Sequence, residues 1–210
     1  MKTEKQNLNA GTYYVKVNRA SRIAKVKYGV TVHFSNLTPL KNCAITLSGS
    51  SLTYNGKSQS PSVTVKNGSA KLILGTDYTV SYKNNKAVGK ATVTIKGKGA
   101  YTGTVTKTFK IVPEGTSIST LSRKSKGFIV TWKKQSTQTT GYQIQYSLSS
   151  KFTSSGTVTV KGTRTLRKTI SGLEKGKKYY VRIRTYKTVS GTKYYSSWSK
   201  AKSVKTKLFG

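Results

Sequence analysis

The strongest constraint on the fold is an alternating stretch near the C-terminal end of the chain. A short turn, Leu173-Glu-Lys-Gly-Lys-Lys, leads into Tyr179-Tyr-Val-Arg-Ile-Arg184. One side of this run carries Tyr179, Val181 and Ile183, and the other carries Tyr180 and the charged residues Arg182 and Arg184. Such period-two alternation predicts a strand with one buried face. Because Tyr179 comes directly after the turn, we expect its hydroxyl to bond the preceding backbone.

A second alternating run, Phe128-Ile-Val130-Thr-Trp132, lies further upstream. It places Phe128, Val130 and Trp132 on one face of a strand. We therefore predict Trp132 as the anchor of a core into which Tyr142 and Tyr179 also point, with Trp198 on the outer face of the same unit.

The chain has 210 residues, enough for one large domain or for two sandwiches of about a hundred residues each. Its hydrophobic fraction of 34% and formal net charge of +35 would also suit a disordered chain. Alternating strands and regularly spaced turn glycines favour a folded, all-β protein instead.

The positive charge is spread over the whole chain. Lysine and arginine number 7 in residues 1–40, 11 in residues 41–113 and 21 in residues 114–210, against four acidic residues in total. Outward-facing lysines keep sheets soluble and protect exposed strand edges, and this is the preferred explanation for the charge. Salt-dependent attraction of polyanions follows in either case.

Residues 1–40 are predicted to be a partial strand segment, the remnant of an upstream domain. Two alternating runs, Gly11–Val17 and Tyr28–Phe34, would form a hairpin, which is marginal in water by itself. The stretch Asn9-Ala-Gly-Thr-Tyr-Tyr-Val-Lys-Val17 resembles the closing hairpin of β-sandwich modules found upstream of repeats in large bacterial exported proteins. No apolar segment follows Met1 in the manner of a signal peptide, so we interpret the chain as part of a longer protein.

Residues 41–113 contain short alternating runs separated by turn sequences. The turns are Tyr54-Asn-Gly-Lys, Lys66-Asn-Gly-Ser, Lys83-Asn-Asn-Lys and Lys96-Gly-Lys-Gly. Asn-Gly between alternating strands predicts a hairpin, because both residues tolerate positive φ. With Leu74-Gly-Thr-Asp-Tyr-Thr-Val-Ser-Tyr82 and Gly89-Lys-Ala-Thr-Val-Thr-Ile95, the block resembles the bacterial immunoglobulin-like repeat of surface adhesins and cell-wall proteins.

Residues 114–210 follow a short linker, Val112-Pro-Glu-Gly115, across which few contacts are expected. Their pattern is similar to a fibronectin type III domain. The first, second, third, fifth and sixth strands would carry Leu121, Trp132, Tyr142, Ile170 and Tyr179 in that order, and the last hairpin would turn at Ser190-Gly-Thr192. In this resemblance Tyr179 is the tyrosine corner of an immunoglobulin-like sandwich. The turn Val189-Ser-Gly-Thr lacks the cell-attachment tripeptide of animal members, so integrin-type binding is not implied. The lysine-rich composition also resembles copies in exported proteins of Gram-positive bacteria.

The residues that could support catalysis are few and scattered. Glu4, Asp77, Glu114 and Glu174 fall in three different blocks, whereas acid–base catalysis by carboxylates needs two together. His33 and Cys43 lack a third orienting group, and a lone Cys43 forms no internal disulfide. No metal-ligand spacing or phosphate loop is present, and no enzyme activity, metal or cofactor is expected. Asp77 is expected to make a turn hydrogen bond; the alternative is a buried acid assisting a lysine–asparagine crosslink.

One mixed aromatic and basic surface is a candidate binding site. It comprises Arg182, Arg184, Tyr194, Tyr195 and Trp198. Stacking of guanidinium groups on the rings would stiffen the sheet. The alternative is a flat aromatic platform for sugar rings or nucleobases.

The sequence therefore predicts tandem immunoglobulin-like sandwiches in a non-catalytic structural or adhesive module of a bacterial cell-surface or secreted protein. One alternative is polyanion or nucleic-acid binding through the basic surface, although no helix or RNP-like aromatic run is present. Another is an accessory role at the C-terminal end of a larger secreted hydrolase. Expected partners are cell-wall or other anionic polymers, or carbohydrate. No membrane span is expected, and the protein is expected to be extracellular and monomeric.

Overall fold

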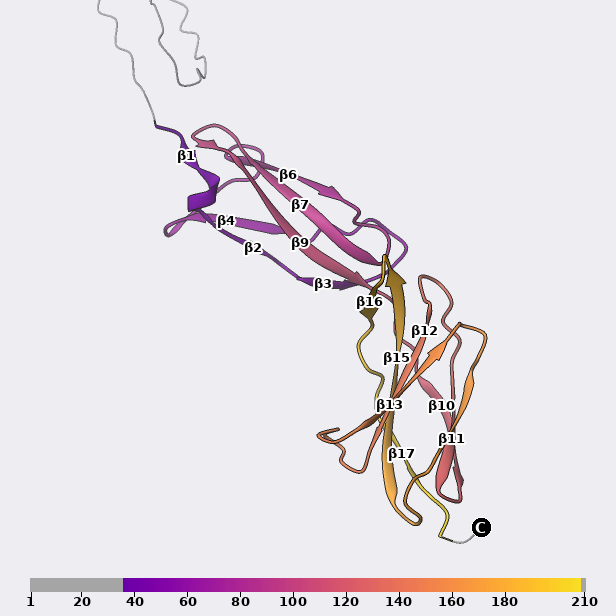
Figure 1. Ribbon diagram of the computed structural model, residues 1–210. Coiled ribbons are helices and arrows are strands. Elements are labelled where there is room, and N and C mark those ends of the chain that lie inside the picture. The colour runs from indigo at the N-terminus through magenta and orange to yellow at the C-terminus, as the bar shows by residue number, and fades with distance from the viewer. Residues whose placement is uncertain (1–35, 209–210) are drawn as a thin grey trace, which may run out of the picture.

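The computed structural model describes residues 36–208, which are built from strands and one three-residue 3₁₀ turn, Leu40–Asn42 (Figure 1). The predicted strands in residues 11–17 and 28–34, and with them His33, lie outside the described residues. Within residues 36–208, no helix is long and apolar enough to cross a membrane. The all-β prediction is confirmed.

The first group of strands forms two facing sheets and a short parallel pair. One sheet has the order β2 (Ala44–Leu47), β4 (Val63–Asn67), β5 (Ala70–Lys71). The other has the order β3 (Ser51–Thr53), β9 (Thr104–Val112), β7 (Gly89–Gly97), β6 (Tyr78–Lys83). β1 (Thr38–Pro39) pairs in parallel with β8 (Tyr101–Thr102).

Strand β7 illustrates why this sequence forms a sheet. Ala91, Val93 and Ile95 are fully buried, while Thr92 and Thr94 between them are half-buried on the other face. β-branched side chains at alternating positions suit a pleated strand with one face in the core. The alternation read from the sequence is therefore the alternation that the sheet uses.

The predicted turns have two different outcomes. Asn67-Gly68 turns β4 into β5 with Gly68 at φ 59°, and Asn84 between β6 and β7 has φ 57°, so these hairpins are confirmed. The hairpin expected at Tyr54-Asn-Gly-Lys is wrong. β3 pairs in parallel with β9 and β4 pairs with β2, so the chain crosses there from one sheet to the other. Gly56 still has positive φ, but it serves a crossover.

The second group of strands also forms two facing sheets. One has the order β10 (Ile118–Lys124), β11 (Gly127–Trp132), β14 (Arg167–Ser171). The other has the order β13 (Gly156–Lys161), β12 (Gly141–Ser147), β15 (Lys178–Val189), with β16 (Thr192–Tyr195) and β17 (Lys202–Lys205) both paired to β15. Phe128, Val130, Trp132, Tyr142 and Tyr179 are all buried in the core, as predicted.

The turn before β15 has the geometry expected of a tyrosine corner. The backbone N–H of Glu174 donates to the hydroxyl of Tyr179 over 3.3 Å. Gly176 takes the positive φ of 64° that closes the turn. The predicted hydroxyl-to-backbone bond is confirmed, and it fixes where β15 begins.

The two groups lie end to end and make more contacts than expected across the connection (Figure 1). Tyr194 of β16 packs against the cluster of Val88, Ala91, Phe109 and Ile111 in the first group. The backbone N–H of Val88 donates to Gln138 Oε1 over 3.3 Å. The short linker did not reveal these contacts, because Val88, Gln138 and Tyr194 come from loops and a strand outside it.

Candidate functional site

The candidate binding surface lies on the outer face of β15, where two arginines project between aromatic rings. The guanidinium carbon of Arg182 lies 4.0 Å from the ring centroid of Phe152 and 4.8 Å from that of Trp198. That of Arg184 lies 4.2 Å from Trp198 and 3.9 Å from Tyr195. The five side chains thus form a stack of alternating rings and cations, called the ladder below.

Two glutamines of the neighbouring strand β12 orient the arginines. Arg182 Nε donates to Gln145 Oε1 over 2.6 Å, and Arg184 Nε donates to Gln143 Oε1 over 2.8 Å. Partial burial lowers the pKa of both guanidiniums. The nearby charge of Arg182 lowers the pKa of Arg184 further, while Tyr195 acts in the opposite direction. Both groups stay charged, because an arginine pKa begins far above neutral pH.

The ladder includes four of the five side chains expected from the sequence. Arg182, Arg184, Tyr195 and Trp198 lie together, whereas Tyr194 faces away and packs at the joint with the first sandwich. Adjacent residues of a strand point to opposite faces, so Tyr194 and Tyr195 could not share one surface.

Phe152 was not expected in the ladder. It lies in the serine-rich loop between β12 and β13 and has φ 57°. A positive φ is uncommon for a bulky residue and indicates a local constraint. The only signal in the sequence was a single large apolar residue among polar ones, Ser149-Ser-Lys-Phe-Thr-Ser.

This arrangement favours edge-on contacts over face-on stacking. A sugar ring or nucleobase stacks on the exposed face of an aromatic ring. In the ladder, guanidinium groups lie over the rings of Phe152, Trp198 and Tyr195. The ladder therefore presents the edges of rings and guanidiniums, and it contains the cation–π contacts expected from the sequence.

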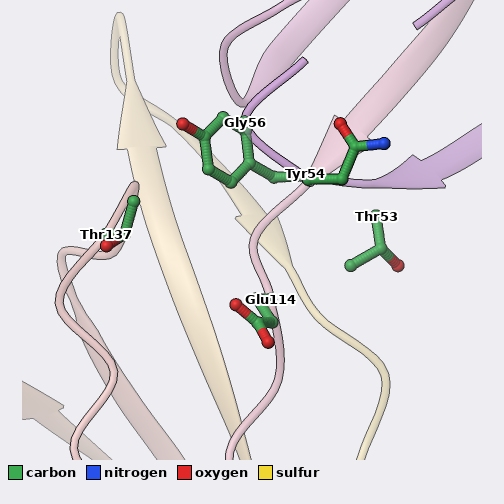
Figure 2. A pocket seen from close by; sticks show the side chains of 6 residues that line it. Thr53, Tyr54, Gly56, Glu114 and Thr137 are labelled. Atoms are coloured by element: carbon green, nitrogen blue, oxygen red, sulfur yellow. The ribbon is translucent and has the colours of Figure 1, made fainter.

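A second feature is a shallow hollow at the joint between the sandwiches (Figure 2). Its lining comprises Thr53, Tyr54, Asn55, Gly56, Glu114 and Thr137. Tyr54 follows β3, Glu114 lies on the connecting segment and Thr137 comes from a loop of the second sandwich (Figure 2). Glu114 Oε2 accepts from Gln135 Nε2 over 2.9 Å, so its carboxylate is engaged by a neighbouring amide.

The three acids that the structure describes are each engaged at a different place. Asp77 Oδ2 accepts from the N–H of Ile73 over 2.7 Å, which is the turn bond expected of it. Glu114 bonds Gln135 at the joint, and Glu174 lies 3.9 Å from Lys177 at the opposite end of the second sandwich. Cys43 packs half-buried against the core of the first sandwich. Within residues 36–208, no three His, Cys, Asp or Glu side chains come together as a metal site would require.

Comparison with known proteins identifies the second sandwich. Residues 112–202 match the fibronectin type III domain, and the prediction for this part of the chain is confirmed. No curated protein matches the chain.

Three similar solved structures have low identity. A β-1,2-glucanase from Parabacteroides distasonis shares 20% identity over 56% of this chain and 18% of its own, with a TM-score of 0.33. The FN1–FN3 domains of chicken CNTN1 share 13% over 82% of this chain and 68% of theirs, with a TM-score of 0.39. A two-domain fibronectin type III segment of chicken tenascin shares 17% over 78% of this chain and 98% of its own, with a TM-score of 0.44. The match to the glucanase thus spans less than a fifth of that enzyme's length.

Proposed function

We propose that this chain is a non-catalytic structural and adhesive segment of a bacterial extracellular protein, in which two sandwiches form one stiff spacer. The observation that carries the proposal is the position of Tyr194. Tyr194 belongs to the second sandwich, but its ring packs against the buried cluster of Val88, Ala91, Phe109 and Ile111 in the first sandwich. An apolar contact across a joint resists bending, whereas domains joined by a bare linker move independently.

The connecting segment is held to the second sandwich by hydrogen bonds. Pro113 is buried, and the hydroxyl of the fully buried Thr185 donates to the Glu114 carbonyl over 2.6 Å. Thr116 Oγ1 donates to the Lys133 carbonyl over 2.5 Å. These two hydrogen bonds restrict the backbone torsion angles of the segment between the end of β9 at Val112 and the start of β10 at Ile118.

The setting of this spacer follows from the resemblances in the sequence. We assign the first sandwich to the bacterial immunoglobulin-like repeats of surface proteins, supported by the turn and strand motifs between residues 54 and 111. The fibronectin type III domain that follows it is a type usually found outside the cell. A monomeric spacer of this kind could equally support a larger secreted hydrolase, because it supplies distance and not chemistry.

Stiffness is measurable with two spin labels, one at an exposed position of each sandwich. Lys66 on β4 and Lys168 on β14 are exposed, so a Cys43→Ala, Lys66→Cys, Lys168→Cys variant accepts one label on each. Double electron–electron resonance should give a narrow distance distribution. The same protein with Tyr194→Ser should give a broad one while its circular dichroism is unchanged. A broad distribution in the parent protein would refute the spacer function.

A further inference from the structure

Beyond the spacer role, we propose that the ladder face binds an acidic polysaccharide. Its carboxylate or sulfate groups would pair with Arg182 and Arg184, and its sugar hydroxyls would bond the polar side chains beside them. This site does not depend on the stiffness of the joint. It differs from an aromatic platform, because the guanidinium edges make the contact.

The first observation is that the polar groups of this face occur in two equivalent rows. Strand pairing aligns Thr159, Gln143 and Arg184 in one row, and Thr157, Gln145 and Arg182 in the next. The rows are two residues apart along each strand, a separation of about 6.5–7 Å. A site that repeats its hydroxyl, amide and cation at a fixed step suits a ligand that repeats as well. A polymer with an anionic group on successive units has this property.

The second observation is that the guanidiniums retain free donors. Each arginine carries five N–H groups in a planar fork, and one of them, on Nε, bonds a glutamine. The three acids that the structure describes are engaged elsewhere, with Ile73, Gln135 and Lys177. The Nη edges are therefore available to oxyanions of a ligand, which guanidinium forks bind in bidentate fashion.

The third observation is that the two charges are held side by side. Stacking on Trp198 and bonding to β12 fix both guanidiniums, and their mutual repulsion lowers the pKa of Arg184. An anion placed against both would relieve this repulsion. Because the side chains are already ordered, little conformational entropy would be lost on binding.

The same geometry disfavours nucleic acid. Single-stranded nucleic acids gain much of their binding energy by stacking bases on aromatic faces. Guanidinium groups already lie over the rings of the ladder. A polysaccharide needs no such face, because its hydroxyls can bond the exposed Thr157 and Thr159 and its anionic groups can reach the arginine edges.

The test compares charge-conserving variants, so that general attraction to a protein of net charge +35 stays constant. Arg182→Lys with Arg184→Lys keeps every charge but removes the planar forks. The matched control is Arg123→Lys with Arg167→Lys, the same change at two exposed arginines of the opposite sheet. Binding is measured by calorimetry at about 0.15 M salt, where long-range attraction is screened. The probes are polygalacturonate, dextran sulfate and neutral dextran.

We expect the Arg182/Arg184 variant to bind polygalacturonate or dextran sulfate about tenfold more weakly, and the control variant to bind like the parent. Tighter binding of polygalacturonate would identify carboxylate as the preferred group, and tighter binding of dextran sulfate would identify sulfate. Thr157→Val with Thr159→Val should weaken polymer binding without changing the affinity for inorganic sulfate. Thermal melting confirms that each variant is folded.

Two results would overturn the proposal. One is equal binding by the folded Arg182/Arg184 variant and the control. The other is tighter, arginine-dependent binding of poly(dT) than of either acidic polysaccharide, which would make the face a nucleic-acid site.

Discussion

The indole ring of Trp132 packs against the ring of Tyr142, with centroids 5.3 Å apart and planes inclined by 60°. Both side chains are buried between the sheets of the second sandwich. Truncating a buried tryptophan costs about 3–5 kcal/mol, out of about 5–15 kcal/mol that stabilises a domain. Trp132→Ala should therefore unfold residues 118–205 at moderate temperature, measured by thermal denaturation.

Fluorescence provides an independent measurement of the same core. The chain has two tryptophans, so Trp198→Ala leaves Trp132 as the only indole. Its emission should be blue-shifted, as expected for the 3% exposure of Trp132. Emission like that of free indole from a folded protein would contradict the register of β11.

Replacing Trp198 should destabilise the protein less than replacing Trp132, but by a measurable amount. The ring contacts two guanidiniums, and each cation–π contact contributes about 0.5–1 kcal/mol at an exposed site. We expect Trp198→Ala to lower the free energy of unfolding by about 1–2 kcal/mol, more than an outer-face position alone would suggest. A loss as large as that of Trp132→Ala, measured by urea denaturation, would show that the ladder is part of the core.

The register of the second sandwich could be predicted because a large aromatic residue marks the buried face of β11, β12 and β15. Trp132, Tyr142 and Tyr179 alternate with polar neighbours, and a shift of one residue would bury the polar neighbours. The crossover at Asn55-Gly56 could not be predicted from the turn alone. Asn-Gly allows positive φ in any tight turn. The turn does not show that β3 pairs with the distant strand β9, or that β4 pairs with β2, the strand before β3.

The first sandwich should lose stability at high pH. Burial raises the pKa of Tyr78 and Tyr82, whose hydroxyls donate to the carbonyls of Val63 and Pro61. Below pH about 10, the ordinary tyrosine pKa, both tyrosine side chains are protonated in the folded and in the unfolded state. Their contribution to the free energy of unfolding is then fully present. As pH rises above 10 towards the raised values, only the unfolded chain ionises and the free energy of unfolding falls.

This dependence is measured by thermal melting between pH 8 and 11. The variant Tyr78→Phe with Tyr82→Phe should start about 1–2 kcal/mol less stable, because two hydrogen bonds are lost, and should then decline less steeply. Equal slopes for the variant and the parent would show that other groups cause the decline.

The connecting segment should resist proteolysis because its backbone is bonded. Thr185→Val removes the hydroxyl that holds the Glu114 carbonyl and keeps the shape of the side chain. Losing this hydrogen bond should destabilise the closed segment by about 1 kcal/mol, which raises the population of the opened segment about fivefold. Cleavage after Glu114 by a glutamate-specific protease should accelerate by that factor, while Thr159→Val on exposed β13 should have no effect. Rapid cleavage of the parent protein would show that the segment is already open.

The ladder was easier to anticipate than the joint, for a physical reason. Arg182 and Arg184 share one face of one strand, so period-two alternation brings them together without knowledge of the fold. Phe152 and Tyr194 reach their positions through a loop conformation and a domain contact, which no local pattern encodes. Tyr194 in particular appears in the sequence as one more strand aromatic beside Tyr195.

The central claim, a stiff joint made by Tyr194, is tested most directly by residual dipolar couplings of the weakly aligned protein. Backbone couplings from residues 41–112 and from residues 118–205 should fit a single alignment tensor with the arrangement in Figure 1. In the Tyr194→Ser protein, the two sandwiches should require tensors of different magnitude. Two different tensors in the parent protein would contradict the claim, because they would mean that the sandwiches reorient independently with Tyr194 in place.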